Sequence, residues 1–245
     1  ATNVFAHIEN VHEILRCILD LLTSDGVFIS ESHYLLPLIE TLQYDTIYHE
    51  HLRYYSLHSL KHLLEMHDLE VFHAKRIPTH GGSVRVYAAR KGSISVKETV
   101  ASLLEEEKIK ILDQQQLMKF KEDVVTSKLE LHSLLLDLKK KKLRVCGVGA
   151  PSRASTLINY VGLDDGLIDY VLEIKGSHKI GCYIPGTLIP IVDESILFEE
   201  QPEYALLFSW HIAEELAPKL KQLGFKGDFI IPLPEPRILN NSSIR

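Results

Sequence analysis

The chain has 245 residues, of which 45% are hydrophobic and 24% are charged, and this composition excludes a disordered or collagen-like protein. No apolar run approaches the ~18 residues that a membrane span needs, and the net charge of -6 argues against a protein that grips nucleic acid through a basic face. The three cysteines form no CxxC pair. We therefore expect a cytoplasmic protein of one or two domains, with reduced thiols and with neither a membrane nor a nucleic-acid partner.

The first part of the sequence, residues 1–92, has the pattern of the closing half of an α/β domain. Residues 1–8 read as the end of a buried strand, where domains rarely begin, so we expect further sequence before residue 1. Hydrophobic periodicity then predicts a helix, a strand, a helix and two strands, over residues 12–22, 26–30, 57–64, 69–74 and 83–89. His80, Gly81 and Gly82 separate the last two, which predicts a hairpin at the edge of the sheet.

Residues 93–142 contain neither glycine nor proline, and their apolar residues recur at helical spacing. This pattern predicts one long helix, or two stacked helices, as a connector between domains. A coiled-coil dimerisation arm is the alternative, although only part of the stretch keeps a heptad-like rhythm. The basic residues 139–142 are expected to close the helix, because cations complement the carboxyl end of the helix dipole.

The last part, residues 143–237, is predicted to be a complete smaller α/β domain, followed by a tail over 238–245. Strands are predicted over residues 143–148, 167–173, 188–192, 204–209 and 228–231, with helices over 154–161 and 211–223. Strands that alternate with helices indicate a parallel sheet, as in a Rossmann-like fold. The predicted fold class is therefore α/β, with a half domain, a helical connector and a Rossmann-like domain in chain order.

The residues best suited to acid–base chemistry lie between Tyr44 and Leu57, where histidines, acids and tyrosines are close together in the sequence. Closely spaced titratable groups push one another's pKa values apart, which is how sites acquire an acid and a base near neutral pH. If this segment is extended, His49 and His51 share one face while Tyr48 and Glu50 share the other. A polar surface loop is one alternative. A zinc site is another, but the HExxH spacing that places two imidazoles on one helical face is missing.

Two further places are candidates for binding or catalysis. His7 follows the predicted opening strand, and open α/β sheets bind ligands at the carboxyl ends of their strands. Residues 147–152 join a strand to a helix whose N-terminus favours phosphate, although Ser152 stands where the dinucleotide fingerprint has its third glycine. Glu173 ends the next strand, where an acid that binds ribose would lie. The alternative is a purely structural turn built on Gly147 and Gly149.

Several motifs together resemble the sugar C-methyltransferase family, whose members use S-adenosylmethionine to methylate a carbon of a nucleotide-linked keto-sugar. The motifs are residues 3–7 (NVFAH), 44–57 (YDTIYHEHLRYYSL), 149–160 (GAPSRASTLINY), 183–187 (YIPGT), 206–210 (LLFSW) and 232–237 (PLPEPR). Their order along nearly the whole chain makes the resemblance specific. One departure is His211, because family members often have Ala-Trp-Asn where this chain has Ser209-Trp210-His211, which implies a different substrate.

The resemblance implies three parts: an N-terminal zinc module, a class I methyltransferase domain and a C-terminal Rossmann-like domain. This chain would begin after the fourth strand of the second part. The cysteines of the zinc module and the glycine-rich cofactor loop are absent from residues 1–245. Zinc is therefore expected only in a preceding module, and no metal site is expected in this chain.

The resemblance also implies roles for individual residues. His51 is the expected general base that forms an enolate of the keto-sugar, with His49 as its rival. Tyr48 and His7 are expected to donate hydrogen bonds to the developing oxyanion. Glu50 is expected to orient an imidazole or a sugar hydroxyl. Separately from these roles, we predict that Asn3 contacts S-adenosylmethionine. Gly149 and Ser152 are predicted to form part of a nucleotide or phosphate subsite at the start of the helix, with Arg153 near the anion.

The leading functional hypothesis is thus an S-adenosylmethionine-dependent methyltransferase that acts on a nucleotide-sugar. A second hypothesis, from a different class, is a regulatory or assembly module that binds a nucleotide at residues 147–152 without catalysis. An NAD-dependent oxidoreductase is a weaker third, because Ser152 leaves the dinucleotide fingerprint incomplete.

Overall fold

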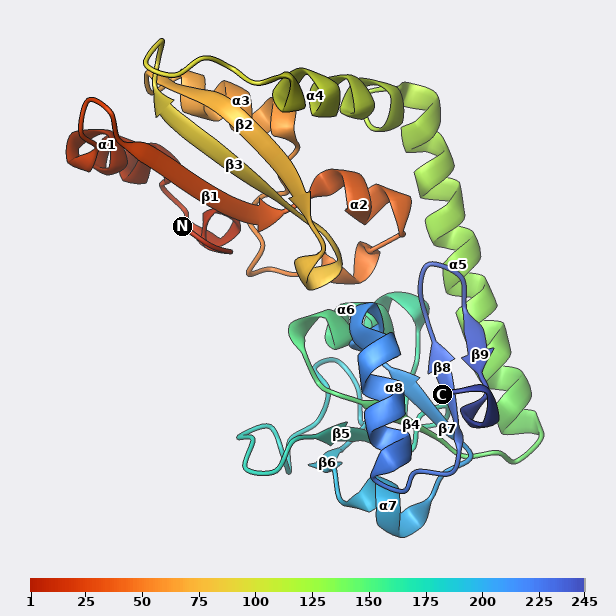
Figure 1. Cartoon of the computed structure of the whole chain (residues 1–245). Coiled ribbons are helices and arrows are strands. Elements are labelled where there is room, and N and C mark those ends of the chain that lie inside the picture. The colour runs from red at the N-terminus through yellow and green to blue at the C-terminus, as the bar shows by residue number, and fades with distance from the viewer. Residues whose placement is uncertain (245) are drawn as a thin grey trace. The chain divides into compact units, whose positions relative to one another are not determined.

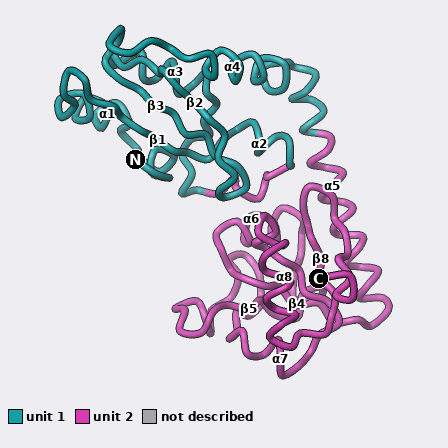
Figure 2. The backbone as a smooth tube through the Cα atoms, in the orientation of Figure 1, with its two compact units in different colours: residues 1–41, 49–121 teal, residues 42–48, 122–245 magenta. Residues whose placement is uncertain are grey.

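The computed structural model describes residues 1–244, which divide into two compact units (Figure 2). Unit 1 comprises residues 1–41 and 49–121, and unit 2 comprises residues 42–48 together with the chain from residue 122 onward. The short segment 42–48 therefore belongs to unit 2 although unit 1 surrounds it in the sequence. No helix of the described chain combines the length and the hydropathy that crossing a membrane requires.

Unit 1 is a three-stranded antiparallel sheet with helices packed against it (Figure 1). Its elements are α1 (Val11–Leu21), β1 (Val27–His33), α2 (Leu35–Glu40), α3 (Leu57–Glu65), β2 (Leu69–Ile77), β3 (Ser83–Arg90) and α4 (Glu98–Lys110). The strand order is β1-β3-β2, so β3 is central and pairs with β1 from Val27↔Ala89 to His33↔Ser83. Leucines of α1 and α3 and valines of β2 and β3 form the core of this unit.

The predicted hairpin is confirmed, and its turn shows why small residues occur there. His80, Gly81 and Gly82 have φ of 55°, 85° and 119°, three positive values in succession. A Cβ on Gly82 would lie 2.6 Å from the ring of Pro37, so glycine is needed for space as well as for conformation. Of the two hairpin strands, β2 lies at the edge of the sheet and β3 does not.

The beginning of the chain differs from the prediction. Residues 1–8 are not the end of a strand: Thr2 makes one parallel bridge to Glu31, and Phe5–His7 then form a turn of 3-10 helix. β1 is longer than the predicted 26–30, because the polar residues after Ser30 find partners across the sheet. Glu31, for example, accepts hydrogen bonds from Arg85 and Thr79 at 2.8 and 3.0 Å.

Unit 2 is a six-stranded sheet with helices around it, and it has the predicted α/β architecture (Figure 1). Its elements are α5 (Gln114–Lys140, shared with unit 1 up to residue 121), β4 (Val145–Val148), α6 (Ser152–Val161), β5 (Val171–Glu173), β6 (Ile191–Asp193), α7 (Ile196–Glu200), β7 (Tyr204–Leu207), α8 (Ala213–Gln222), β8 (Asp228–Ile231) and β9 (Arg237–Leu239). The strand order is β6-β5-β4-β7-β8-β9, and every neighbouring pair is parallel except β8–β9. This parallel-rich order confirms the Rossmann-like fold class.

Several boundaries in unit 2 differ from the prediction. β5 begins at Val171 rather than at residue 167, because the carbonyl of Asp164 accepts hydrogen bonds from the amides of Leu167 and Ile168 and holds them in a turn. The predicted strand 188–192 corresponds to β6, which begins later, at Ile191, and ends at Asp193. The predicted helix 211–223 is a 3-10 turn, Trp210–Ile212, followed by α8. The predicted tail, 238–245, contains the last two residues of β9, which begins at Arg237 and pairs with β8.

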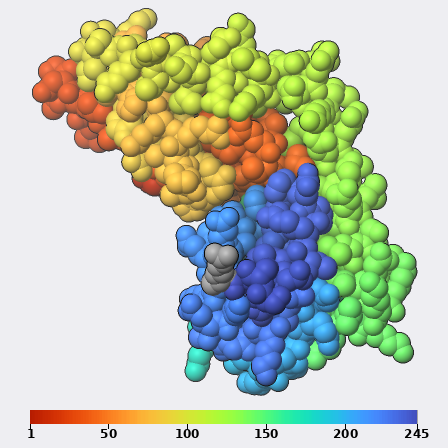
Figure 3. Space-filling model, turned by 45° about the vertical axis from the view of Figure 1, so that its right-hand side comes forward, coloured from red at the N-terminus to blue at the C-terminus, as the bar shows by residue number. Residues whose placement is uncertain are grey.

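The predicted connector forms two helices, α4 and α5, of which the second is much the longer. Leu131, Leu135 and Leu138 of α5 are buried in the core of unit 2 together with Ile230 of β8. Figures 1 and 3 show β8 and β9 beside this part of α5. These leucines are buried in the core of unit 2. They are therefore not available for the interface that a coiled-coil arm would need.

Candidate functional site

Two histidines of unit 1, His7 and His33, lie beside His51. Its ring centroid lies 4.9 Å from that of His7 and 6.2 Å from that of His33, and Tyr54 meets it edge-on at 5.9 Å. His51 is half-buried, whereas His7 is exposed. Imidazoles change charge near neutral pH, so a cluster with one ring exposed is suited to receiving a proton from a ligand.

Hydrogen bonds between two distant segments bring this cluster together. The amide of Leu52 donates to the carbonyl of Ala6 at 2.9 Å. The guanidinium of Arg53 donates to the carbonyl of Glu9 at 2.8 Å. These two hydrogen bonds therefore bind the backbone just before and just after the end of the 3-10 helix. The sequence positions that resembled one family motif, residues 3–7, thus lie against those that resembled another.

The ring of His7 has a defined tautomer. Its Nδ1 lies 2.8 Å from the backbone carbonyl oxygen of Glu50. A carbonyl only accepts, so Nδ1 carries a proton, and Nε2 of the neutral ring is an acceptor. The predicted role of His7 as a donor to an oxyanion therefore requires an imidazolium ring. The backbone of Glu50 orients this imidazole, which the prediction had given to the side chain.

The segment around the two predicted bases is a turn and not an extended strand. Tyr48, His49 and Glu50 lie in a bend and a turn, so the predicted division of faces does not apply. His49 and Glu50 are exposed, while Tyr48 is half-buried and belongs to unit 2. Of the two candidate bases, His51 is the one with other imidazoles beside it.

His33 is the residue of this cluster that sequence reasoning missed. It is the last residue of β1. The signal was present in the polar run Ser30-Glu31-Ser32-His33, which follows an apolar stretch. Ending the predicted strand at Ser30 removed His33 from consideration.

Asn3 is the residue predicted to contact the cofactor. It is half-buried and has φ 55°, a left-handed conformation that asparagine tolerates, and its amide donates to the carbonyl of Glu31 at 2.8 Å. The carboxylate of Glu31 is bound by Arg85 and Thr79. The contact of Asn3 with S-adenosylmethionine stays a prediction.

The zinc alternative has no support in the geometry. Within residues 1–244, no group of three or more histidine, cysteine, aspartate or glutamate side chains is arranged to hold a metal ion. Cys146 is buried, and this burial raises the pKa of its thiol well above the usual range, so it is not a nucleophile near neutral pH.

Unit 2 contains a cavity of about 380 Å³ at the carboxyl ends of β4, β5 and β7. Gly149 and Pro151 line it beside apolar residues of α8, and Glu173 and Lys179 supply charged groups. Lys179 donates to the carbonyl of Ala150 at 2.6 Å and lies 3.7 Å from Glu173. This is the position at which open parallel sheets bind their ligands, and the volume is within the range of small-molecule sites.

The three residues predicted to bind a nucleotide lie differently with respect to this cavity. Gly149 lines it, with φ 81°. Ser152 begins α6. Arg153, predicted near an anion, is instead buried and paired with Asp45: its Nε and Nη2 donate to the carboxylate at 2.8 and 2.9 Å. It is not among the residues that line the cavity.

Two family models match this chain. One, described as a C-methyltransferase C-terminal domain, covers residues 78–234, and one described as a methyltransferase domain covers residues 1–74. The C-methyltransferase NovU of Streptomyces niveus is 35% identical over 242 residues, which are 98% of this chain and 57% of that protein. The chain thus spans little more than half the length of this relative.

These matches confirm the resemblance that the sequence motifs indicated. They cover both halves of the chain, and they include the turn that carries His51 as well as the sheet that carries the cavity. The chain therefore belongs to the C-methyltransferase family.

Proposed function

We propose that the protein transfers a methyl group to a carbon atom of a nucleotide-linked keto-sugar, and that His51 removes the proton from that carbon. The observation that carries this proposal is the placement of His51 within a cluster of imidazoles, inside a motif of a C-methyltransferase family. A carbon beside a ketone is acidic enough for an imidazole base only when the enolate oxygen is stabilised. S-adenosylmethionine, when bound, supplies the methyl group.

The other residues of the motif have supporting roles in this proposal. Tyr48 donates a hydrogen bond to the enolate oxygen. His7, held by the carbonyl of Glu50, does the same when its ring is protonated, and in its neutral form it presents an acceptor at Nε2. His33, with its ring centroid 6.2 Å from that of His51, is the added candidate for accepting the proton onward.

We further propose that the cavity of unit 2 holds the nucleotide of the substrate. Glu173 would accept hydrogen bonds from ribose hydroxyls, as acids at the end of such strands do, and Lys179 would stand near the phosphates. Titration with a nucleoside diphosphate tests this: Glu173→Gln should weaken binding. The noncatalytic nucleotide-binding alternative would give the same result here, so the chemical step needs its own experiment.

That experiment is the exchange of the carbon-bound hydrogen of the substrate with deuterated water in the absence of methyl donor. His51→Asn should slow exchange by ~10²–10⁴, the usual contribution of a general base, with a much smaller change in substrate affinity. His49→Asn is the matched control, because His49 is only two residues away and is exposed.

The outcomes separate the candidates. Exchange that survives in His51→Asn and disappears in His49→Asn would assign the base to His49. Exchange that survives in both would exclude both, and His7 and His33 would be tested next. A protein that binds the nucleotide but never exchanges the hydrogen would support the noncatalytic alternative.

A further inference from the structure

Residues 42–48 are built into unit 2 as if they were one of its own elements. Tyr44 lies in the core of that unit with its ring centroid 5.1 Å from that of Tyr160 on α6. Gln43 and Thr46 are buried, and the hydroxyl of Thr156 donates to the carbonyl of Ile47 at 3.3 Å. The segment is therefore held from Leu42 to Ile47.

Asp45 is the polar centre of this attachment. Its carboxylate accepts hydrogen bonds from Nε and Nη2 of Arg153 in a bidentate ion pair. It also accepts a hydrogen bond from Nε1–H of Trp210 at 2.8 Å. The side chains of Asp45 and Arg153 are only 1% and 9% exposed. A bidentate, buried carboxylate–guanidinium pair with a third donor fixes both position and orientation.

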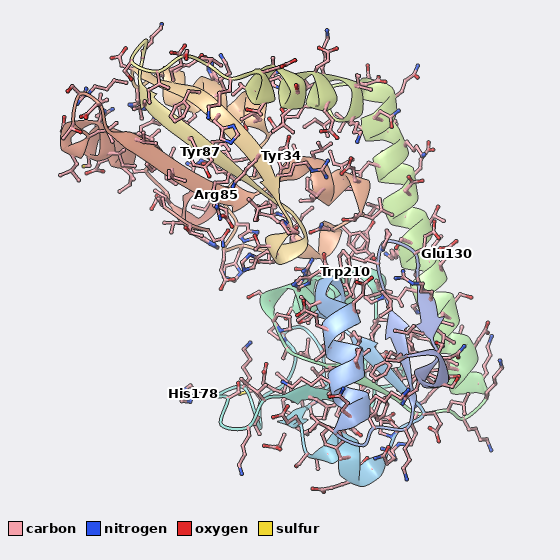
Figure 4. The ribbon with its side chains drawn as sticks, viewed as in Figure 1. Tyr34, Arg85, Tyr87, Glu130, His178 and Trp210 are labelled. Carbon is pink, nitrogen blue, oxygen red and sulfur yellow. The ribbon has the colours of Figure 1, made fainter. Side chains whose placement is uncertain are left out.

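Two aromatic residues complete the enclosure of Arg153. Its Nη1 lies 2.7 Å from Nδ1 of His211, and because arginine only donates, this Nδ1 is an acceptor. The guanidinium carbon lies 5.2 Å from the ring centroid of Trp210, within the range of a cation–π contact. Figure 4 labels Trp210 where the chain enters α8. The proposed chemistry uses none of these groups.

We propose that Asp45 and Arg153 are positioning residues for the reaction, because they fix the segment of unit 2 that leads to Tyr48, the proposed donor to the enolate oxygen. This inference rests on the proposed function of Tyr48 and His51. Tyr48 is three residues after Asp45 and belongs to the same unit. Misplacement of a reacting group by 1 Å can cost about 10²-fold in rate, so an anchor this close in the chain governs the reaction without touching the substrate.

The test measures hydrogen exchange of the keto-sugar in Asp45→Asn and Arg153→Lys, each on the protein at its natural length. Asparagine keeps the shape of Asp45 and loses its charge, while lysine keeps the charge of Arg153 and loses the planar fork. We expect the exchange rate at saturating substrate to fall at least about tenfold, and the substrate affinity to change by less than about threefold. The emission of Trp210 should shift in both, since its hydrogen-bond partner moves.

Asp169→Asn is the matched control. Asp169 also forms an ion pair within unit 2, with Arg144, but at the opposite end of the sheet from residues 42–48. Its loss should reduce stability while the exchange rate stays at the wild-type value. A second substitution, His211→Asn, keeps a short acceptor for Arg153 and should retain most of the rate, whereas His211→Leu should not.

Two results would overturn the inference. One is a wild-type exchange rate in a variant whose Trp210 emission has shifted. The other is an equal fall in Asp169→Asn, which would show that any loss of stability slows the reaction. His51→Asn is measured beside them: if it abolishes exchange and the Asp45 and Arg153 variants do not, only the positioning role fails, and if it has no effect, the proposed function fails and the positioning role with it. Arg153→Lys decides if Asp45→Asn does not fold.

Discussion

Replacing Gly147 by alanine should destabilise unit 2, because β4 and the ring of Phe208 approach too closely for a side chain. A Cβ on Gly147 would lie 2.4 Å from Cε2 of Phe208 and 2.9 Å from Cγ2 of Val171. Carbon atoms in contact lie at about 3.5–4.0 Å, so the ring must move by roughly 1 Å or more. Phe208 is 1% exposed and buried in the core, which leaves it no open space.

Two opposing effects determine the size of the loss. Overpacking of a core costs about 1–3 kcal/mol, whereas alanine in a strand is favoured over glycine by about 0.5–1 kcal/mol. At the midpoints of these ranges the packing cost is the larger, so Gly147→Ala should lower the free energy of unfolding by about 1 kcal/mol, and by no more than about 2.5 kcal/mol. The effect should be confined to unit 2, where both atoms lie.

The assay is urea unfolding followed by tryptophan fluorescence. The chain has one tryptophan, Trp210, and it lies in unit 2, so the signal reports that unit alone. Phe208→Leu removes the ring atom that clashes, and the double variant should lose less stability than the sum of the single changes, with a coupling of about 0.5–3 kcal/mol. Gly162→Ala is the control, because nothing lies within 4 Å of its Cβ and only its φ of 81° opposes a side chain. Strict additivity of Gly147→Ala and Phe208→Leu would refute the packing explanation.

Two further predictions concern unit 1. Glu107→Gln should destabilise α3 by about 1–3 kcal/mol, because the buried carboxylate of Glu107 accepts the first amides of that helix and Nδ1 of His58 at 2.6 Å; amide hydrogen exchange of α3 measures this, and unchanged protection would contradict it. Burial raises the pKa of Glu31, but hydrogen bonds from Arg85 and Thr79 outweigh it, and the net pKa lies below the usual 4.5. The stability from this group is therefore complete above pH 4.5 and lost as the pH falls through the lowered pKa, so Glu31→Gln should flatten the acid side of the stability–pH curve of unit 1.

Local patterns predicted those features of the molecule whose causes are local. The hairpin at His80–Gly82 follows from glycines that adopt positive φ, and the alternation of strands and helices in unit 2 follows from hydrophobic periodicity. The same reasoning placed Gly149 correctly at the carboxyl ends of the strands. The motif around His51 was recognisable because chemically active residues are dense there.

The features that were missed depend on partners far away in the chain. Arg153 had no visible counterpart, because Asp45 is 108 residues earlier in the sequence. Gly147 resembled part of a phosphate-binding loop, yet it is small because of Phe208 and does not line the cavity. β1 was predicted too short because the acid of Glu31 finds its arginine only across the sheet. In each case tertiary packing outweighed the local pattern.

The discontinuity of unit 2 has a consequence for how the chain is assembled and exchanged. During synthesis, residues 42–48 leave the ribosome about a hundred residues before α6, their partner. Their contacts with unit 2 can therefore form only after α6 has been made, and forming them closes a long loop. Loop-closure entropy grows only with the logarithm of length, and the delay is thermodynamically cheap. Recombination between relatives meets a stricter condition. A hybrid that exchanged only the chain from residue 122 onward would combine the core of one parent with residues 42–48 of the other, so these seven residues must travel with the C-terminal half.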